Sequence, residues 1–389
     1  MGMRLTFPIP QFPFTYTAEG ETLSIRREEG KITLSVRYDF DPRPLTLTGE
    51  GTVGEVAEVR LLPHRIELLV GGVLFDEEWP VGRCLFDGGL PRDVALTEWE
   101  EPRAEEPSVL STFEGAEGWR PGGGVFVGDC MPYRRGEEYH VLYLKDRHHH
   151  GSKWGLGAHQ WEHLSTLDFK TWRVHPMAVP ITDPEEGSIC TGSHIAHGGR
   201  EYLFYTVRRP RGEAAPIMRS VSADGFHFEK DPAFGFTVGK EYHAASARDP
   251  KVVKGEDGLF HMFLTTSLLP ENRGCLAHFV SRDLDTWEDV GTPIYISPDE
   301  RQPECPDWFA YGGRYYLVFS GHYMVSDEPF SGFWMPEDPI IPCESVPKGA
   351  LWGDRLVFTG FRRLGGYGGT LTFKAARAKE TGELTFEEL

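Results

Sequence analysis

Apolar and polar residues alternate along most of this chain, which is the pattern of strands with one buried face. From residue 136 on, a turn on glycine or aspartate followed by a strongly alternating stretch recurs five times. The copies read GEEYHVLYL from Gly136, GREYLFYTV from Gly199, DGLFHMFLT from Asp257, GGRYYLVFS from Gly312 and GDRLVFTGF from Gly353. Units that repeat every roughly 40 to 60 residues are typical of propeller blades. The pattern predicts an all-β protein with a five-bladed β-propeller; generic hairpins of a sandwich are the alternative.

The first part of the chain has a different pattern. Residues 1–110 lack the repeat but alternate between short turns, most clearly over 45–82. They predict a small β-sandwich that precedes a propeller domain at 111–389. The acidic, proline-bearing stretch 98–107 suits a linker between the two. We expect the sandwich to pack on a blade, and carbohydrate binding or dimerisation is the alternative role.

Charge and composition narrow the choice of partners. Aspartate and glutamate number 59 against 40 lysines and arginines, so the net charge is −19. Such a surface repels nucleic acid and anionic membranes, and we expect neither as a partner. Aromatic residues make up 13% of the chain, which suits a pocket for a neutral sugar. The N-terminus lacks the basic start and apolar run of a secretory signal, so a cytoplasmic location is expected.

Three acidic residues occupy the same position in three of the repeats. Asp129, Asp249 and Glu304 each precede the aromatic residue of their own repeat by ten or eleven positions, and Thr191 takes this position in the second repeat. Equivalent positions on the innermost strands of a propeller converge on its axis. Like charges gathered there oppose stability, and such an arrangement usually marks a functional site.

Paired carboxylates indicate glycoside cleavage. One carboxyl group protonates the leaving oxygen, and the other attacks the anomeric carbon or activates water. A third acid nearby can hold sugar hydroxyls and influence the proton donor. The sequence therefore predicts a glycosidase.

Four segments carry a resemblance to a known family. GDCMPYRRGEEYHVLYL, SICTGSHI, ARDPKVV and PECPDWF follow one another as the motifs of glycoside hydrolase family 32 do, and families 68 and 43 are related. The resemblance covers roughly residues 120–365 and implies a five-bladed propeller with its site at the mouth of the axis. It implies that Asp129 is the nucleophile, Asp249 the transition-state stabiliser and Glu304 the acid/base.

The resemblance also implies sugar contacts. Arg248, in the Arg-Asp-Pro triplet, can bond a sugar hydroxyl or hold Asp249 ionised. The segment HQWEHLSTLDFKTW is similar to the family's Trp-Gly-His-Ala stretch and places Trp161 and His163 near the sugar. CTGSHI is similar to its Ser-Gly-Ser stretch and makes Thr191 and Ser193 candidate contacts.

The segment DRHHHGSKWG supplies further candidates, namely Asp146, Arg147, His149 and Trp154. Trp154 is either a stacking platform or a buried core indole. The run His148–His150 cannot point three side chains one way on a strand, so we expect no metal site there. The six cysteines (84, 130, 190, 275, 305 and 343) contain no CxxC pair. We expect free thiols, no zinc and no cofactor.

One departure from the family leaves the substrate open. This chain reads Gly128-Asp129-Cys130-Met131-Pro132, where the family has Asn-Asp-Pro-Asn-Gly. We expect a small neutral oligosaccharide or glycoside as substrate, cleaved with retention as a β-fructofuranoside. The alternatives are an inverting family 43-like furanosidase such as an arabinofuranosidase, a glycosyl-transferring relative, or a sugar-binding propeller without catalysis. A homo-oligomer formed through the sandwich is also considered.

Overall fold

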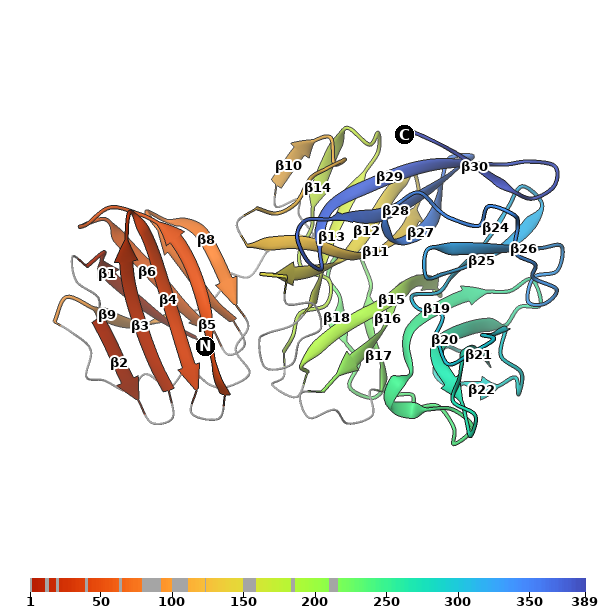
Figure 1. The fold of residues 1–389 in the computed structure, drawn as a ribbon, viewed down its shortest axis with the longest axis horizontal. Helices are drawn as coiled ribbons and strands as arrows, with labels where there is room; N and C mark the ends of the chain where they lie inside the picture. Colours follow the sequence, from red (N-terminus) through yellow and green to blue (C-terminus); the bar gives the residue numbers. More distant parts are fainter. Residues whose placement is uncertain are drawn as a thin grey trace.

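The structure is a computed structural model, and it describes residues 2–10, 14–18, 21–38, 41–62, 65–78, 92–99, 111–122, 124–149, 159–182, 186–209 and 216–389. In these ranges every regular element is a β-strand, apart from one short 3-10 turn at Ala244–Ser246, and turns and loops connect the strands. None of the helical structure in these ranges has the length and apolarity needed to cross a membrane. The all-β prediction is confirmed (Figure 1).

The first nine described strands form two packed sheets, the red and orange part of Figure 1. One sheet has the order β8–β7–β6–β1–β9, with bounds Val73–Glu78, Arg65–Val70, Val56–Leu62, Gly2–Pro8 and Ala95–Trp99. The other runs β2–β3–β4–β5, with bounds Phe14–Ala18, Glu21–Glu28, Lys31–Tyr38 and Asp41–Glu50. Alternate residues such as Ile32, Leu34 and Val36 are fully buried between the sheets. The sandwich precedes the propeller, as the sequence predicts.

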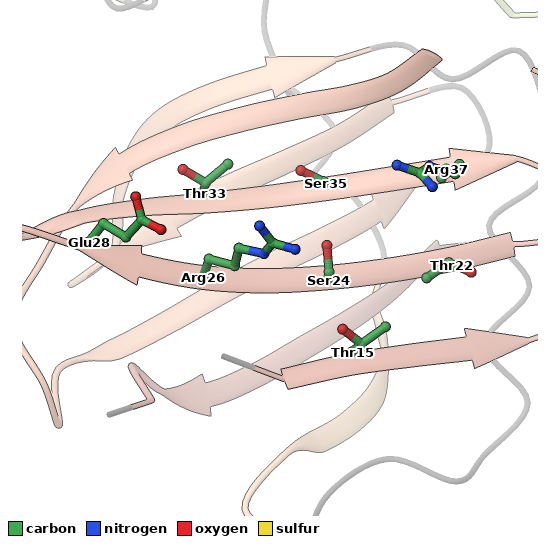
Figure 2. A pocket seen from close by; sticks show the side chains of 8 residues that line it. All are labelled: Thr15, Thr22, Ser24, Arg26, Glu28, Thr33, Ser35 and Arg37. Atoms are coloured by element: carbon green, nitrogen blue, oxygen red, sulfur yellow. The ribbon is translucent and has the colours of Figure 1, made fainter. Parts of the chain in front are cut away.

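The outward face of the second sheet is polar. Figure 2 shows hydroxyl and charged side chains in rows along β3 and β4, with Thr15 on the neighbouring β2. They line a shallow pocket of about 420 Å³ and are Thr15, Thr22, Ser24, Arg26, Glu28, Thr33, Ser35 and Arg37. The period of two along each strand therefore sends apolar residues inward and polar residues to this face.

The described strands from β10 onward form five blades. Blade 1 comprises β11 (Val125–Arg135), β12 (Glu138–Arg147), β13 (Gln160–Thr166), β14 (Thr171–Val174) and β10 (Ser111–Glu114). Blade 2 comprises β15 (Ser188–His197), β16 (Arg200–Arg208), β17 (Ile217–Ser222) and β18 (Glu229–Lys230). Blade 3 comprises β19 (Arg248–Lys254), β20 (Phe260–Leu268), β21 (Arg273–Ser281), β22 (Glu288–Asp289) and β23 (Tyr295–Ile296).

Blade 4 comprises β24 (Asp307–Tyr311), β25 (Arg314–Phe319) and β26 (His322–Ser326). Blade 5 comprises β27 (Ser345–Trp352), β28 (Arg355–Arg363), β29 (Gly369–Ala378) and β30 (Leu384–Glu387). The first strands of the blades contact one another, so β11, β15, β19, β24 and β27 are innermost. The ring closes where β29 pairs with β11 at Gly369 and Val127, and Figure 1 shows the blue fifth blade beside the yellow first blade.

Buried charges join the sandwich to blade 1. The end of β8 presents an acidic run, Asp76–Glu78, toward the end of β12, and all three acids are buried. The ion pairs are Lys145–Glu77 (2.5 Å), Arg147–Glu78 (3.5 Å) and His148–Asp76 (3.1 Å). Burial raises the pKa of Glu78 to about 7, against the opposing effect of Arg147. The contact therefore depends on charges that are matched away from water.

We expect Arg147→Met to destabilise the protein, because it leaves Glu78 without this partner in a buried contact. Arg147 and Glu78 are each about 1% exposed, and removing one member of a buried pair costs about 3–5 kcal/mol. Urea unfolding measures the loss. Arg377→Met is the control, since Arg377 pairs with Glu387 at the surface and should cost less than about 1 kcal/mol. Equal losses in both variants would contradict a stabilising role for the buried contact.

Candidate active site

One pocket at the propeller axis brings five of the predicted residues together. Its volume is about 160 Å³. It is lined by Asp129, Leu144, Cys190, Thr191, Arg208, Arg248, Asp249, Glu304, Cys305 and Tyr367. All three predicted catalytic acids are in this set, with Thr191 and Arg248. The equivalent sequence positions therefore do meet at one place.

Shifts in the pairing register of the innermost strands turn these side chains toward the pocket. The register shifts between Val127 and Cys130 in β11, and between Ile189 and Gly192 in β15. The same happens between Arg248 and Lys251 in β19. A bulge bends its strand and turns one side chain away from the regular alternation, and bulges are common next to active sites. Each of these three segments contains the residue that faces the pocket, which is Asp129, Thr191 and Asp249 respectively.

Asp129 sits deep in the pocket and is 8% exposed. The hydroxyl of Tyr367 donates to its Oδ1 at 2.6 Å, and that of Thr191 donates to its Oδ2 at 2.5 Å. The thiol of Cys305 lies 3.5 Å from the same Oδ2. Three donors from three blades thus orient the carboxylate, as a nucleophile needs.

Tyr367 is one of the pocket residues that the sequence analysis missed, and Arg208 and Cys305 are others. It stands in the segment Gly365–Gly369, between β28 and β29, and its glycine-rich surroundings carry no catalytic motif. Burial, and next the charge of Asp129, raise the pKa of its phenol well above the ordinary value, so the hydroxyl keeps its proton and donates. The Nδ1 atom of His149 lies 2.5 Å from its backbone oxygen, and the ring of His159 stacks on it. These contacts hold the phenol against Asp129.

We expect Tyr367→Phe to lower kcat by roughly 10- to 100-fold, because a hydrogen bond to a charged group contributes about 1.5–3 kcal/mol. The fold should be unchanged. The matched control is Tyr316→Phe, which removes a buried hydroxyl that donates to the backbone of Gly382, far from the pocket. Steady-state kinetics of both variants on the same substrate make the comparison. Full activity in the Tyr367 variant would remove this residue from the machinery.

Cys305 links two of the acids. Its backbone N–H donates to Oδ2 of Asp249 at 3.1 Å, and its thiol lies 3.6 Å from that oxygen. Burial, then the charges of Asp249 and Asp129, raise the pKa of the thiol well above its ordinary value, so it remains a weak donor. Cys305 and Asp249 both adopt the left-handed backbone region, with φ of 54° and 57°. Non-glycine residues persist there only where their surroundings hold them, which is common at functional sites.

Arg248 lies between Asp249 and Glu304. Its Nη2 atom donates to Oε1 of Glu304 at 2.5 Å, its Nη1 to Gln302 at 2.6 Å, and its Nε lies 3.6 Å from Asp249. Burial disfavours the charge, but Asp249 and Glu304 together raise the pKa of Arg248 above its ordinary value. The side chain of Glu304 is 61% exposed, whereas Asp129 is buried. The pocket thus has one acid at its base and one at its mouth.

Three other predicted sugar contacts do not line this pocket. Trp161 is fully buried between blades 1 and 2, and its indole N–H donates to the backbone of Cys190 at 3.0 Å. His163 is fully buried beside His140. Ser193 donates to the backbone oxygen of Pro250 at 2.8 Å and joins blade 2 to blade 3. Trp161 and Ser193 therefore hold the backbone beside the pocket-lining residues Cys190 and Asp249.

The remaining candidates lie around Tyr367 or beyond it. Asp146 is fully buried and accepts from Nε2 of His159 at 3.1 Å, and His149 stacks on Phe126. Arg147 faces the sandwich, as described above. Trp154 lies outside the described residues. The five cysteines in the described ranges are free thiols, and Cys130 is fully buried.

The arrangement suits the chemistry of a small pocket with an open mouth. A buried carboxylate can attack a ring held at the base, and an exposed carboxyl can protonate an oxygen that leaves toward solvent. The volume is below the range of about 300–1,000 Å³ that is usual for larger ligands. Within the described ranges, the groups close enough to share a metal ion are His140, His163 and His175, which lie outside this pocket.

The sequence matches a known family over half its length. Residues 131–331 match the model of the glycosyl hydrolases family 32 N-terminal domain. The sucrose-6-phosphate hydrolase of Bacillus subtilis (strain 168) is 32% identical over 203 residues, which are 48% of this chain and 41% of that protein. The sucrose-6-phosphate hydrolase of Vibrio alginolyticus is 27% identical over 203 residues, 49% of this chain and 40% of that protein. The matches thus span about two fifths of these relatives.

Solved structures show the shared fold. Fructan 1-exohydrolase IIa from Cichorium intybus superposes with a TM-score of 0.57 at 18% identity, covering 74% of this chain and 62% of that one. The GH43_1 enzyme from Xanthomonas citri, complexed with xylose, superposes with a TM-score of 0.52 at 14% identity, covering 68% and 91%. At such identities these likenesses establish the propeller architecture alone.

Proposed function

Because the chain belongs to glycosyl hydrolase family 32, we propose that it cleaves a terminal furanoside, in the first place a β-fructofuranoside, by double displacement. Asp129 attacks the anomeric carbon and forms a glycosyl-enzyme intermediate. Glu304 protonates the leaving oxygen and then takes a proton from the incoming water. Asp249 binds sugar hydroxyls and stabilises the positive charge of the transition state. The observation that carries this proposal is the meeting of these three carboxyl groups, from three blades, in one pocket.

The depth of the two reacting acids supports action at a chain end. Asp129 is buried and Glu304 is largely exposed. The sugar that is attacked therefore occupies the base of the pocket, and the rest of the substrate extends through the mouth. A volume of about 160 Å³ suits one sugar ring. We propose exo action for this reason.

The names of the relatives support the same substrate class. The curated relatives are named sucrose-6-phosphate hydrolases, and a solved neighbour from Bombyx mori is named a beta-fructofuranosidase. Sucrose and its 6-phosphate both carry a terminal fructofuranosyl group. A fructofuranoside is thus the first substrate to test.

An inverting furanosidase is the second candidate. The residues around the proposed nucleophile are Gly128, Cys130 and Met131, and none offers the amide that the family's asparagines would present to fructose. In an inverting enzyme Asp129 would activate water instead of attacking the sugar. Arabinofuranosides are the substrates to compare.

One experiment separates the two candidates. The full-length protein is incubated with sucrose, a short fructan and an aryl arabinofuranoside, and the first product is followed by NMR. We expect release of fructose with its anomeric configuration kept. An inverted product would make Asp129 a general base, and an absence of product across the panel, with sucrose 6-phosphate included, would contradict the proposed activity.

The position of Arg208 supports the proposal of a substrate with an anionic group on the leaving sugar. It lies at the end of β16 and lines the pocket, and no hydrogen bond or ion pair joins its guanidinium to another described residue. We expect Arg208→Met to lower kcat/KM for sucrose 6-phosphate by roughly 10- to 100-fold more than for sucrose, because charge-assisted bonds to phosphate contribute about 1.5–3 kcal/mol. Arg200→Met, at the exposed start of β16, is the control. Equal effects on both substrates would exclude phosphate recognition by Arg208.

One further proposal concerns the assembly of the protein. The polar face of β3 and β4 carries both Arg26 and Glu28 (Figure 2), so a two-fold axis could pair each with the other in a partner subunit. We propose self-association through this face, which size-exclusion chromatography with light scattering tests. A monomer across the accessible concentrations would contradict it. The cytoplasmic location stays a prediction from the sequence.

A further inference from the structure

Three buried histidines meet on the face of blade 1 that packs against blade 2. His140 lies on β12, His163 on β13, and His175 directly after β14. Their exposed fractions are 0%, 0% and 2%. One ring nitrogen from each lies within 4.8 Å of the other two. We call these residues the blade 1 histidine cluster.

Strand pairing explains why the rings share one face. Tyr133 of β11 is opposite His140, and His140 is opposite Ser165 of β13. Residues opposite one another, and residues two apart on one strand, project to the same side of a sheet. Ser165 and His163 are two apart, so His163 and His140 point the same way. The backbone N–H of His175 bonds to the backbone oxygen of His163 and keeps the third ring beside them.

The hydrogen bonds within the cluster leave two ring nitrogens without a partner among the described residues. Nδ1 of His140 lies 2.8 Å from Nε2 of His163, and Nε2 of His175 lies 2.7 Å from the hydroxyl of Ser165. Among the described residues, Nδ1 of His163 and Nδ1 of His175 have no hydrogen-bond partner. A buried polar atom without a partner costs about 1–3 kcal/mol. The cluster is thus incomplete as a hydrogen-bonded core.

Burial favours the neutral form of all three rings. Burial lowers the pKa of His140, and it lowers that of His175 to about 4. Burial, and next the neighbouring His140, hold the pKa of His163 well below its ordinary value. Neutral imidazole offers a lone pair, whereas imidazolium offers none. The neutral form that burial favours is therefore the form that can bind a metal.

The surroundings of the cluster also resemble a metal site. Nε2 of His140 lies 3.3 Å from a carboxylate oxygen of Glu138. A metal-bound histidine commonly donates its other N–H to a carboxylate, which orients the ring. The hydroxyl of Tyr133 lies 3.1 Å from Nε2 of His163 and is close enough to the three rings to offer a fourth ligand.

We propose that the blade 1 histidine cluster binds a zinc ion. Three imidazole nitrogens suit Zn²⁺, whereas Ca²⁺ and Mg²⁺ prefer oxygen ligands. Two nitrogens on one tetrahedral Zn²⁺ lie about 3.4 Å apart, given Zn–N distances of about 2.0–2.1 Å. The observed 2.8 Å between His140 and His163 and the limit of 4.8 Å for the whole cluster bracket this value. Small ring rotations therefore suffice.

The ion would stabilise the propeller and take no part in the reaction. The pocket with Asp129 contains none of the cluster residues. All three ligands belong to blade 1, and Phe226 of blade 2 packs against each of their rings. A bound ion would hold this face of the blade rigid against its neighbour. Binding to the folded state alone raises its stability by mass action.

The test begins with the metal itself. The full-length protein is produced in zinc-supplemented medium, passed through a desalting column, and analysed for metal by mass spectrometry. We expect about one Zn²⁺ per chain, and a fall in the unfolding temperature after a strong chelator that added Zn²⁺ reverses. A zinc content below a tenth of an equivalent, with no thermal response to added Zn²⁺, would overturn the proposal.

Two variants locate the ion. His175→Gln removes one ligand and should lower zinc content at least tenfold. The control is His278→Gln, because His278 belongs to another buried histidine pair, 2.9 Å from His261 in blade 3, which among the described residues is not part of a group of three ligands close enough to share a metal ion. Equal zinc contents in the two variants would place the metal elsewhere and contradict the proposal.

A spectroscopic measurement on the wild-type protein does not depend on any variant folding. Co²⁺ replaces Zn²⁺ at nitrogen sites and reports its ligands by visible absorption. We expect the bands of a tetrahedral ion without the charge-transfer absorption of a thiolate ligand. Thiolate absorption would assign the ion to a cysteine, and an octahedral spectrum would indicate loose surface binding; either result overturns the proposal.

Discussion

Asp129→Asn should abolish turnover and leave the fold intact. The amide has the size of the carboxylate: its oxygen accepts from one of the hydroxyls of Tyr367 and Thr191, and its NH2 group can donate to the oxygen of the other, so the packing of the pocket is kept. It cannot form the covalent bond to the anomeric carbon. We expect kcat to fall by a factor on the order of 10⁴ or more, as for other nucleophile replacements. Kinetics and circular dichroism of the purified variant measure the two effects.

Replacing Asp129 with a smaller residue tests directly whether it is the nucleophile. Asp129→Gly leaves space for an added anion, and azide should restore cleavage of an activated aryl fructoside by attacking from the vacated side. An azido sugar of inverted configuration would identify Asp129 as the nucleophile. Asp354→Asn, at an exposed turn of blade 5, is the control and should keep full activity. Near-normal turnover in Asp129→Asn would refute the proposed mechanism.

Glu304→Gln should lower kcat by roughly 10²- to 10⁴-fold, which is the usual contribution of a general acid. The loss should depend on the leaving group. Sucrose releases a poor leaving group and needs the proton, whereas an aryl fructoside with an acidic phenol needs it much less. We therefore expect a large loss on sucrose and a small loss in the first step on the aryl substrate. Parallel kinetics on the two substrates test this difference.

In Glu304→Gln, the amide oxygen can still accept the hydrogen bond that Arg248 donates to Glu304, so the guanidinium keeps a partner at this position. Glu300→Gln, an exposed replacement in the same loop, controls for the loss of one negative charge. If Glu304→Gln loses equally on both substrates, Glu304 positions the substrate instead of donating the proton. In that case another group must supply the acid.

Local patterns in the sequence predicted much of the fold. The five repeated stretches correspond to β12, β16, β20, β25 and β28, the second strand of each blade. The middle of each strand is buried continuously, because both of its faces pack within the propeller, and the turn before each strand marks its start in the sequence. The final strand β30 pairs with β29 and completes the last blade. Because the pattern repeats, these strands could be predicted without knowing which other strands pack against them.

The position of the acids could be predicted for the same reason. Asp129 and Asp249 lie at the same place in their units, and equivalent places in repeated blades lie at equal depths around one axis. Spacing could not tell which side of a blade a residue faces. His163 and Trp161 share a segment similar to a sugar-binding motif, yet both point between blades 1 and 2. The neighbouring blade decides which face is buried.

By itself, the sequence determined the strands, the repeat and the acids that the repeat brings to the axis. Only the tertiary structure decided which distant groups meet. Tyr367 donates to Asp129 across 238 positions of the chain, and Arg147 pairs with Glu78 of another sheet. The physical reason is that hydrogen bonding and burial depend on how whole sheets pack. The local sequence around a residue predicts that it lies in a strand. The blade that packs against this strand determines which groups its side chain contacts.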